Sequence, residues 1–336
     1  MAMEIPFEII RAVMPLLPSY DMRLVSKTFR NEFDLLRTRL HIRPPPFMNY
    51  PEELFRRSIN ANELIMTDAK FEMFVKLRGL SDVVPRVQKL TINQTYIDSY
   101  FGVLLTALTN LTKLEIQHAR PSALIIHDIG GMTKLTELRT IVANRGARAI
   151  AEALTNLTKL QKLDLSHMDI TSSIIIAPSL MKLTSLRELR ITHGQLNNTD
   201  MTHFSIFLDL LSNLSLLDLS NNRIGVMYSD DYSSHYAAAT KLLSRLGTSI
   251  AKLSKLETLY LNNNNIDQMA LDIITIQFTS LSSLRTLNIG HNNDLFFVDI
   301  LSLVKKLSNL VTLDIANCEV TLEELSDAFP FLNILI

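Results

Sequence analysis

The stretch LSNLSLLDLSNNRIG at residues 211–225 decides the fold, because its apolar positions recur along the chain. The pattern is LxxLxLxxNxI, and LSKLETLYLNNNNID at residues 253–267 repeats it in full. Weaker copies extend the series to nine, with first positions at Val87, Leu111, Leu135, Leu160, Leu186, Leu214, Leu256, Leu284 and Leu310. Most steps between these positions are 24 to 28 residues, which predicts a stack of structural repeats.

Each copy describes one coil of such a stack. The LxL alternation predicts a short strand with its leucines pointing inward, and one coil cannot bury its leucines unless others stack on it. The Asn position turns the chain out of the strand, and its amide is expected to bond backbone groups of the neighbouring loop. The positions that fit this specification are Asn222, Asn264 and Asn292, with Cys318 as an accepted substitute. Earlier copies carry Ala119, Ala143, Met168 and Gly194 there, so the N-terminal coils should be less regular.

Helical segments lie between the predicted strands. Residues 146–157, 237–253 and 297–307 are apolar at positions i, i+3, i+4 and i+7. Strand, turn, helix and return within one period predict an α/β horseshoe with a concave parallel sheet and convex helices. This pattern resembles the leucine-rich-repeat family, in its ribonuclease-inhibitor-like subclass and the repeats of F-box proteins. The resemblance covers residues 81–336, with about nine repeats and a partial tenth, and it implies a fold and not a function.

Residues 1–43 are not repeats and predict a small helical module. Pro6 suits the first turn of a helix, and the apolar residues that follow it fall on one face. The order Ile-Pro-x-Glu, Leu-Pro-x-x-Asp and Val-Ser-Lys-x-Phe-Arg within residues 5–30 resembles a degenerate F-box. In that family this face docks a Skp-type adaptor of a cullin–RING ubiquitin ligase. The resemblance implies adaptor contacts at Pro6, Ile9, Ile10, Val13, Leu17, Asp21 and Val25.

A second interpretation of residues 1–43 is a helical cap over the first coil, which repeat arrays require. Leu40 and Ile42 predict an edge strand that ends before the prolines at 44–46. Residues 44–80 are then expected to be a helical linker or N-terminal cap.

Outward residues between the leucines should form columns along the concave sheet, with neighbours about 4.8 Å apart. From Lys113 to Arg190 the charges alternate in a checkerboard. One interpretation is a lattice of ion pairs that stabilises the coils, and the other is an electrostatic recognition surface. The C-terminal half is uncharged by comparison, and we expect a partner to dock there on Leu216, Tyr260 and Asn288.

A third column holds half of the histidines, His118, His167, His193 and His291. Two neighbouring imidazoles are not a metal site without a further ligand, so we expect pH-sensitive surface histidines and no metal.

Two other segments are candidates for binding. One step of 42 residues contains an insertion of 14 residues, around 225–240, that carries Tyr228, Tyr232 and Tyr236. Loops on a rigid scaffold often bind partners, although the same spacing suits a helix that covers its own coil. Residues 329–336 begin a tenth strand, which could form an edge contact with a partner.

Composition excludes several classes of function. The 33 basic and 34 acidic residues leave a formal net charge of −1, so we expect no nucleic-acid partner. The single cysteine forbids an internal disulfide, and no apolar stretch suits a signal peptide or a membrane span. We therefore expect an intracellular protein, in the cytoplasm or the nucleus. Phosphate-loop, GxSxG, HExxH and CxxC motifs are absent, so we expect no enzyme and no cofactor.

These patterns predict a protein-interaction module, specifically the substrate-recognition subunit of a Skp–cullin–F-box-type ubiquitin ligase. A non-ligase scaffold, in which residues 1–43 act only as a cap, is the alternative from another class. A third hypothesis is a microbial effector that recruits a host ligase through its F-box.

Overall fold

The structure is a computed structural model of the 336-residue chain. It describes residues 39–42, 62–67, 84–93, 97, 100–141, 146–167, 170–225, 234–292, 295–318 and 322–335. The chain divides into two compact units, Met1–Ala119 and Arg120–Ile336, and each is described by itself.

The first unit is built on four described strands that pair in parallel in chain order. Its elements are β1 (Arg39–Ile42), β2 (Glu63–Thr67), the 3₁₀ helix η3 (Val84–Arg86), β3 (Lys89–Asn93), α5 (Tyr100–Ala107) and β4 (Lys113–Gln117). The predicted strand at Leu40 and Ile42 is confirmed as β1.

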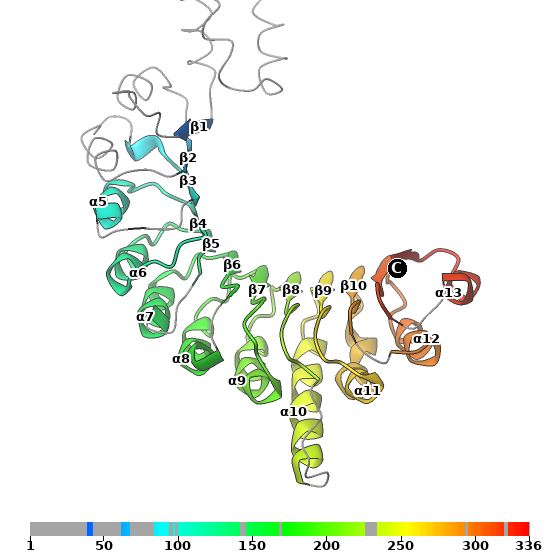
Figure 1. Ribbon diagram of the computed structural model, residues 1–336. Helices are drawn as coiled ribbons and strands as arrows, with labels where there is room; N and C mark the ends of the chain where they lie inside the picture. Colours follow the sequence, from blue (N-terminus) through cyan, green and yellow to red (C-terminus); the bar gives the residue numbers. More distant parts are fainter. Residues whose placement is uncertain are drawn as a thin grey trace, which may run out of the picture. The chain divides into compact units, whose positions relative to one another are not determined.

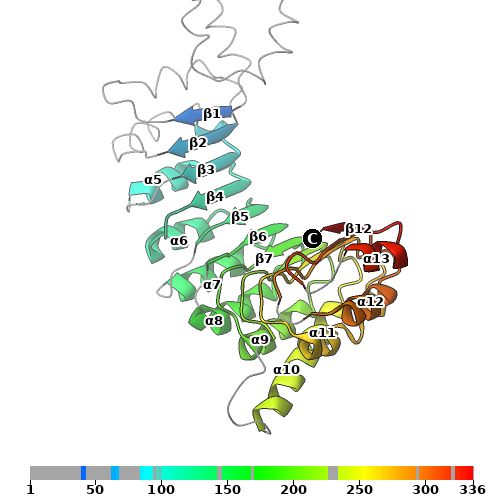
Figure 2. The ribbon, with the colours of Figure 1, turned by 45° about the vertical axis from the view of Figure 1, so that its right-hand side comes forward.

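The helical prediction for residues 44–80 is wrong at β2 (Figure 2). The sequence ELIMT alternates in burial, with Leu64 and Met66 inward, which is the period of a strand and not of a helix. Since β2 pairs with β3 in parallel, the repeat-like stacking begins before residue 81.

The second unit repeats a strand, a turn and a helix in each coil (Figure 1). Its strands are β5 (Glu137–Arg139), β6 (Lys162–Asp164), β7 (Glu188–Arg190), β8 (Leu216–Asp218), β9 (Thr258–Tyr260), β10 (Thr286–Asn288), β11 (Thr312–Asp314) and β12 (Asn333–Leu335). Its helices are α6 (Ala123–Gly130), α7 (Ala147–Asn156), α8 (Ile170–Leu180), α9 (Asn198–Leu208), α10 (Ser234–Ala251), α11 (Gln268–Thr275), η5 (Phe278–Ser280), α12 (Phe297–Lys306) and α13 (Leu322–Ala328).

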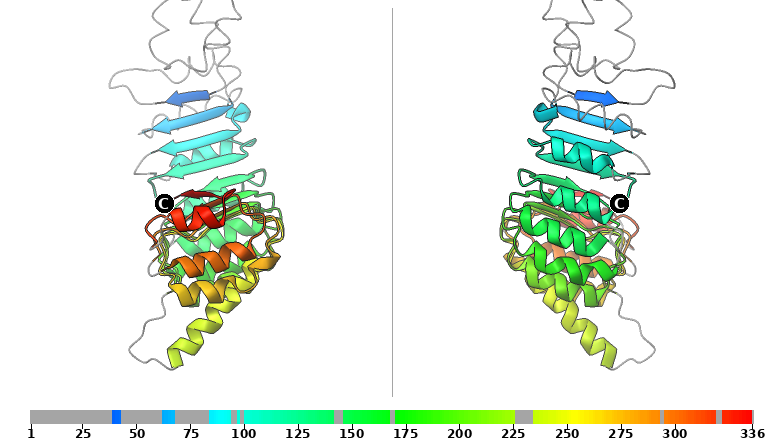
Figure 3. Two further views of the ribbon diagram at one scale, coloured as in Figure 1. Left: turned by 90° about the vertical axis from the view of Figure 1, so that its right-hand side faces the viewer. Right: turned by 90° about the vertical axis from the view of Figure 1, so that its left-hand side faces the viewer.

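Strands β5 to β12 follow one another in a parallel sheet, and the helices cover one face of it (Figures 1 and 3). The fold is thus an α/β leucine-rich-repeat solenoid. Each of the nine predicted copies contributes a strand that begins two residues after its first position, from β3 to β11. The partial tenth copy forms β12, and the three predicted helical segments are confirmed as α7, α10 and α12.

The leucines of the repeat build a core that continues from coil to coil. Leu217 and Leu219 of one coil, and Leu259 and Leu261 of the next, are at most 1% exposed. Since the same positions stack in every coil, each leucine packs on its counterparts in the neighbouring coils, and the core grows with repeat number. This stacking accounts for the 47% of the residues that are hydrophobic.

The predicted asparagine ladder is confirmed. The Oδ1 atom of Asn222 accepts hydrogen bonds from the backbone N–H groups of Gly194 and Leu196, at 3.0 and 3.2 Å. Its Nδ2 group donates to the carbonyl of Ile191, 2.8 Å away in the preceding coil. Asn264 and Asn292 repeat this arrangement one and two coils further on. At the next step the Cys318 thiol, 3.8 Å from the Ile289 carbonyl, takes the position of the amide.

Helix α10 has 18 residues and extends past the helices beside it (Figure 3). Its backbone approaches α11 so closely that a Cβ at Gly247 would lie 2.1 Å from the Ile274 carbonyl oxygen. On its other side, Asp209 at the end of α9 pairs with Arg245 at 2.9 Å and Lys252 at 2.8 Å. Burial alone would raise the pKa of Asp209, but the hydrogen bond from Lys252 and the nearby cations outweigh it and lower that pKa.

Candidate functional site

The uncovered face of the sheet carries the columns predicted from the sequence. Neighbouring strands pair in register, so that Glu137 faces Lys162 and Lys162 faces Glu188. In the adjacent column Arg139 faces Asp164, which faces Arg190. The alternation of opposite charges is therefore confirmed on β5, β6 and β7.

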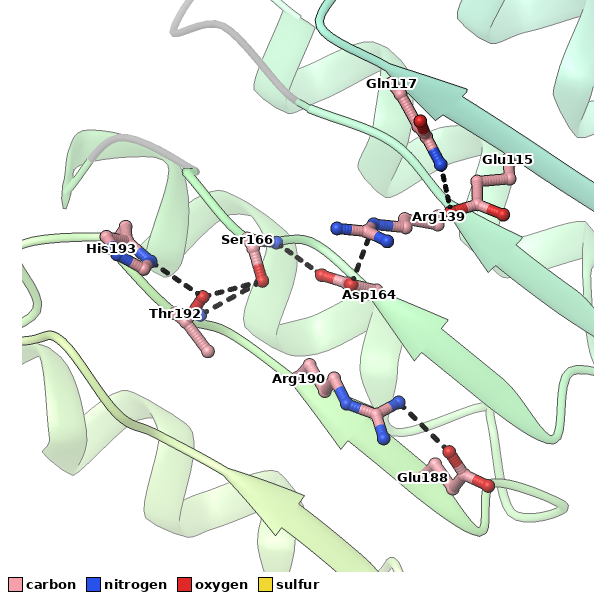
Figure 4. Close-up of polar contacts among 9 residues, drawn as sticks. All are labelled: Glu115, Gln117, Arg139, Asp164, Ser166, Glu188, Arg190, Thr192 and His193. Carbon is pink, nitrogen blue, oxygen red and sulfur yellow. Dashed lines mark hydrogen bonds and ion pairs between the residues drawn. The ribbon is translucent and has the colours of Figure 1, made fainter. Parts of the chain in front are cut away.

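These charges bind one another (Figure 4). Lys162 Nζ lies 2.6 Å from Glu188 Oε1, and Arg190 Nη1 lies 3.0 Å from Glu188 Oε2. Arg139 Nε lies 3.2 Å from Asp164 Oδ2. The hydrogen bond to Glu188 raises the pKa of Lys162. Burial alone would raise the pKa of Glu188, but the hydrogen bonds from its two cations lower it. Each partner is thus held in its charged form, and this half of the face neutralises itself.

The column that contains Arg139 and Asp164 continues to Asp314 on β11, and we call it the middle column. Each of its three aspartates also holds the turn after its strand, a role that was not predicted. One carboxylate oxygen accepts the backbone N–H two residues further on, at 3.0 Å for Asp164, 3.0 Å for Asp218 and 3.1 Å for Asp314. Asn288 makes the same bond to the Gly290 N–H at 3.0 Å. The signal in the sequence was the Asp or Asn at the end of the strand, because these side chains commonly bond their own backbone two residues on.

The histidine column occupies a special backbone conformation. His118, His167, His193 and His291 have φ between 54° and 62°, and the equivalent Asn221, Asn263 and Asn317 have φ between 52° and 56°. Asn and His tolerate this left-handed region better than most residues, which explains their recurrence at this position.

Neighbouring members of this column contact each other. The rings of His167 and His193 stack, with centroids 4.6 Å apart. Burial, and then the charge of His193, lowers the pKa of His167. His193 Nδ1 is 3.0 Å from the Thr192 hydroxyl, which is 2.9 Å from the Ser166 hydroxyl (Figure 4). Within the described part of the chain, no three His, Cys, Asp or Glu side chains come close enough together to hold a metal ion.

The uncovered face of the sheet is different on β8 to β11, because most of its side chains there make no hydrogen bond or ion pair with another described side chain. Leu216 faces Thr258 and Asp218 faces Tyr260 across two adjacent strands. The side chains of Thr258, Tyr260, Thr286 and Thr312 are partly exposed, and none of them hydrogen-bonds to another described residue. Asn288, in contrast, donates from Nδ2 to Asp314 Oδ2 at 2.7 Å. Of the three concave residues expected to bind a partner, Leu216 and Tyr260 lie together and are available, while Asn288 is already engaged.

Other predicted site residues lie outside the described residues. These are all the adaptor residues of the N-terminal module, Pro6, Ile9, Ile10, Val13, Leu17, Asp21 and Val25, together with Tyr228 and Tyr232. Tyr236 falls within α10, but its side chain is not described. At the C-terminal end, β12 pairs with β11 in parallel, and Phe331 just before it is 98% exposed.

Comparisons with known proteins give a limited result. No protein-family model matches the chain. Among solved structures, the chain is similar to the functional domain of InlJ from Listeria monocytogenes, which includes a cysteine ladder. The TM-score is 0.41 and the identity 16%, over 86% of this chain and 55% of that one, so this chain spans about half the length of the structure it matches. Among the described helices, none combines the length and the apolar character needed to cross a membrane.

Proposed function

We propose that this chain is a protein-interaction module that binds a protein on the uncovered face of the sheet at β8 to β11. The observation that carries the proposal is the contrast between the two halves of the sheet. On β5 to β7 the charged groups bind one another. On β8 and β9, in contrast, the aliphatic chain of Leu216, the hydroxyl of Thr258 and the aromatic ring of Tyr260 are partly exposed and make no side-chain hydrogen bond to a described residue. Such a surface, held rigid by the coils below it, loses little conformational entropy when a partner binds.

The proposal extends to the N-terminal module. The order of residues between Ile5 and Arg30 supports adaptor binding, and the chain would then be the substrate-recognition subunit of a Skp–cullin–F-box-type ubiquitin ligase. In that role the repeats hold a bound protein near the transfer machinery, and the rate gain comes from proximity. A scaffold outside any ligase, with residues 1–43 acting as a cap, is the alternative, and a microbial effector would use the same adaptor contact.

Adaptor binding tests the second half of the proposal. The full chain is mixed with a purified Skp-type adaptor at micromolar concentration and analysed by size-exclusion chromatography. The wild type is expected to bind in stoichiometric amounts, and the double variant Ile9→Asp/Leu17→Asp is expected to lose binding. Arg11→Gln is the control, because position 11 lies opposite the predicted apolar face. If the wild type does not bind, the ligase role is refuted and the hypothesis of a scaffold outside any ligase takes its place.

Partner capture tests the first half. Tyr260→Ala, and separately deletion of residues 227–235, are expected to reduce the cross-linking of bound proteins while the circular dichroism spectrum is retained. Phe331→Ala is a matched control, since it removes an exposed aromatic ring at another place. Equal capture by wild type and Tyr260→Ala would refute docking on this face. Loss with Phe331→Ala alone would move the contact to the C-terminal edge.

A further inference from the structure

One carboxylate in the middle column of the sheet differs from its counterparts. Asp164, Asp218 and Asp314 occupy equivalent places, and each uses Oδ1 to hold the turn that follows its strand. In two of the three, the side chain one strand earlier in the column binds the second oxygen. Arg139 lies 3.2 Å from Asp164 Oδ2, and Asn288 lies 2.7 Å from Asp314 Oδ2.

At Asp218 this second contact is missing among the described residues. Arg190 is the residue that faces Asp218 from β7, but its Nη1 atom is directed to Glu188 Oε2 at 3.0 Å (Figure 4). The Asp218 Oδ1 atom accepts the Ser220 N–H and hydroxyl, at 3.0 and 2.7 Å, and Oδ2 makes no hydrogen bond or ion pair to the described chain. A partly buried carboxylate with one unused oxygen favours binding of a hydrogen-bond donor that carries positive charge.

An aromatic residue stands next to Asp218 in the column. Tyr260 follows Asp218 in the column, in register on the adjacent strand, about 4.8 Å away along the sheet. Leu216 and Thr258 flank the pair in the neighbouring column and supply an aliphatic and a methyl surface. A lysine or arginine side chain is suited to this combination, because its head can pair with the carboxylate while its charge and its stem contact the ring and the aliphatic groups.

The charge of the surrounding face favours the same ligand. The outward positions of the described strands β8 to β11 carry two carboxylates, Asp218 and Asp314, and neither Lys nor Arg. On β5 to β7 the three acidic and three basic outward residues cancel. A basic segment therefore gains attraction on β8 to β11 that an acidic or neutral segment does not.

We propose that Asp218 and Tyr260 form a specificity site for a lysine or arginine side chain of the docked protein, presented by an extended segment that lies across β8 to β11. This inference rests on the proposed function and names the chemistry of the partner. The carboxylate selects the positive charge, the ring binds the flat guanidinium or the ammonium, and the threonines beside them contact the backbone and small side chains of the segment.

Four pools of nonapeptides test the site. Their flanks are randomised over Ala, Ser, Thr, Val and Gly, and their central residue is Arg, Lys, citrulline or Glu; binding to the full-length chain is measured by fluorescence anisotropy. Citrulline has the shape of arginine without its charge. The Arg and Lys pools are expected to bind about tenfold tighter than the citrulline and Glu pools at low salt, and the difference should shrink as salt is added.

Two matched variants identify the residues responsible. Asp218→Asn keeps the oxygen that holds the turn, so the fold is retained, and it should abolish the preference for the charged pools. Asp164→Asn makes the same change where the second oxygen is already bound to Arg139, and it should leave the preference intact. Tyr260→Leu should weaken binding of the Arg pool by about fivefold.

The outcomes separate this inference from the proposed function. Equal binding of the Arg and citrulline pools, or equal effects of Asp218→Asn and Asp164→Asn, would overturn the specificity site while docking on this face could still stand. Absence of binding by every pool would also overturn it. Docking itself fails only if folded proteins are captured equally by wild type and Tyr260→Ala.

Discussion

Replacement of Asn264 by alanine tests how the buried amide ladder holds the coils together. The Ile224 N–H, in the coil before, has Asn264 Oδ1 as its acceptor at 3.1 Å and would be left buried without a partner. The carbonyls of Leu219 and Leu261 would each lose one donor but would keep another, from Asn222 and from Asn292.

The free-energy cost follows mainly from these three losses. A fourth bond, of 3.3 Å from Asn264 Nδ2 to the Asn262 carbonyl, adds little, because that carbonyl keeps the Asn221 N–H. An orphaned buried N–H costs about 1–3 kcal/mol, and each bond lost from a carbonyl that keeps a partner costs about 0.5–1.5 kcal/mol. We therefore expect Asn264→Ala to lower the free energy of unfolding by about 3 kcal/mol, within a range of about 2–6 kcal/mol. Asn262→Ala deletes the same group two residues earlier, where the side chain makes no hydrogen bond to a described residue, and it should cost less than about 0.5 kcal/mol.

Urea unfolding followed by circular dichroism measures both costs, and amide hydrogen exchange shows where the loss occurs. Exchange at Ile224 should accelerate in Asn264→Ala and stay slow in Asn262→Ala. Because repeat arrays can lose cooperativity, the local exchange rate decides the result if the urea transition broadens. Equal destabilisation by the two variants, or unchanged protection of Ile224, would refute the role assigned to the ladder.

Three further predictions follow from the packing and the charges. Gly247→Ala should lower the urea midpoint, at a cost of about 1–3 kcal/mol, because the new Cβ would lie 2.1 Å from the Ile274 carbonyl oxygen. Asp209→Asn should cost about 0.5–1 kcal/mol at pH 7. Because the pKa of Asp209 is lowered in the folded chain, its stabilisation is complete above the ordinary pKa of about 3.9 and is lost as the pH falls through the lowered pKa. The difference in unfolding free energy between the wild type and Asp209→Asn should therefore vanish in acid. Burial, the largest cause, raises the pKa of Cys318 to about 11, so alkylation at pH 8 should be about 100-fold slower than in urea.

Each of these predictions has a control or a result that would contradict it. Gly131→Ala should change the midpoint much less, since φ there is −76° and the nearest atom to a new Cβ, the Asp128 carbonyl oxygen 3.3 Å away, needs to shift only slightly. For Asp209, a difference that persists below pH 2 would show that Arg245 and Lys252 are not its cause. For Cys318, alkylation of the folded chain at the rate of the unfolded one would contradict its burial.

The repeat was predictable because its signal is local. The LxL alternation sets the inward face of each strand, and Asn222, Asn264 and Asn292 recur at a place where an amide bonds both the preceding coil and its own. Residues 63–67 were missed because they precede the first recognisable copy, and because the apolar Ile65 on the outward face hides the polar–apolar alternation that marks a half-buried strand. The turn bonds of the middle-column aspartates were not predicted, because a carboxylate at an outward strand position indicates surface charge as readily as a bond to its own backbone.

By itself the sequence determined the coil, its strand, its helix and its buried amide, because each depends on residues within one period or on the same position in the next. The columns on the sheet followed from that period as well. Only the tertiary structure decided how the columns are paired: Arg139 reaches Asp164, whereas Arg190 turns to Glu188 and leaves one oxygen of Asp218 unused. The physical reason is that different rotamers of a long side chain reach an acceptor on its own strand or one on the next strand. Only the packed structure shows which rotamer is adopted.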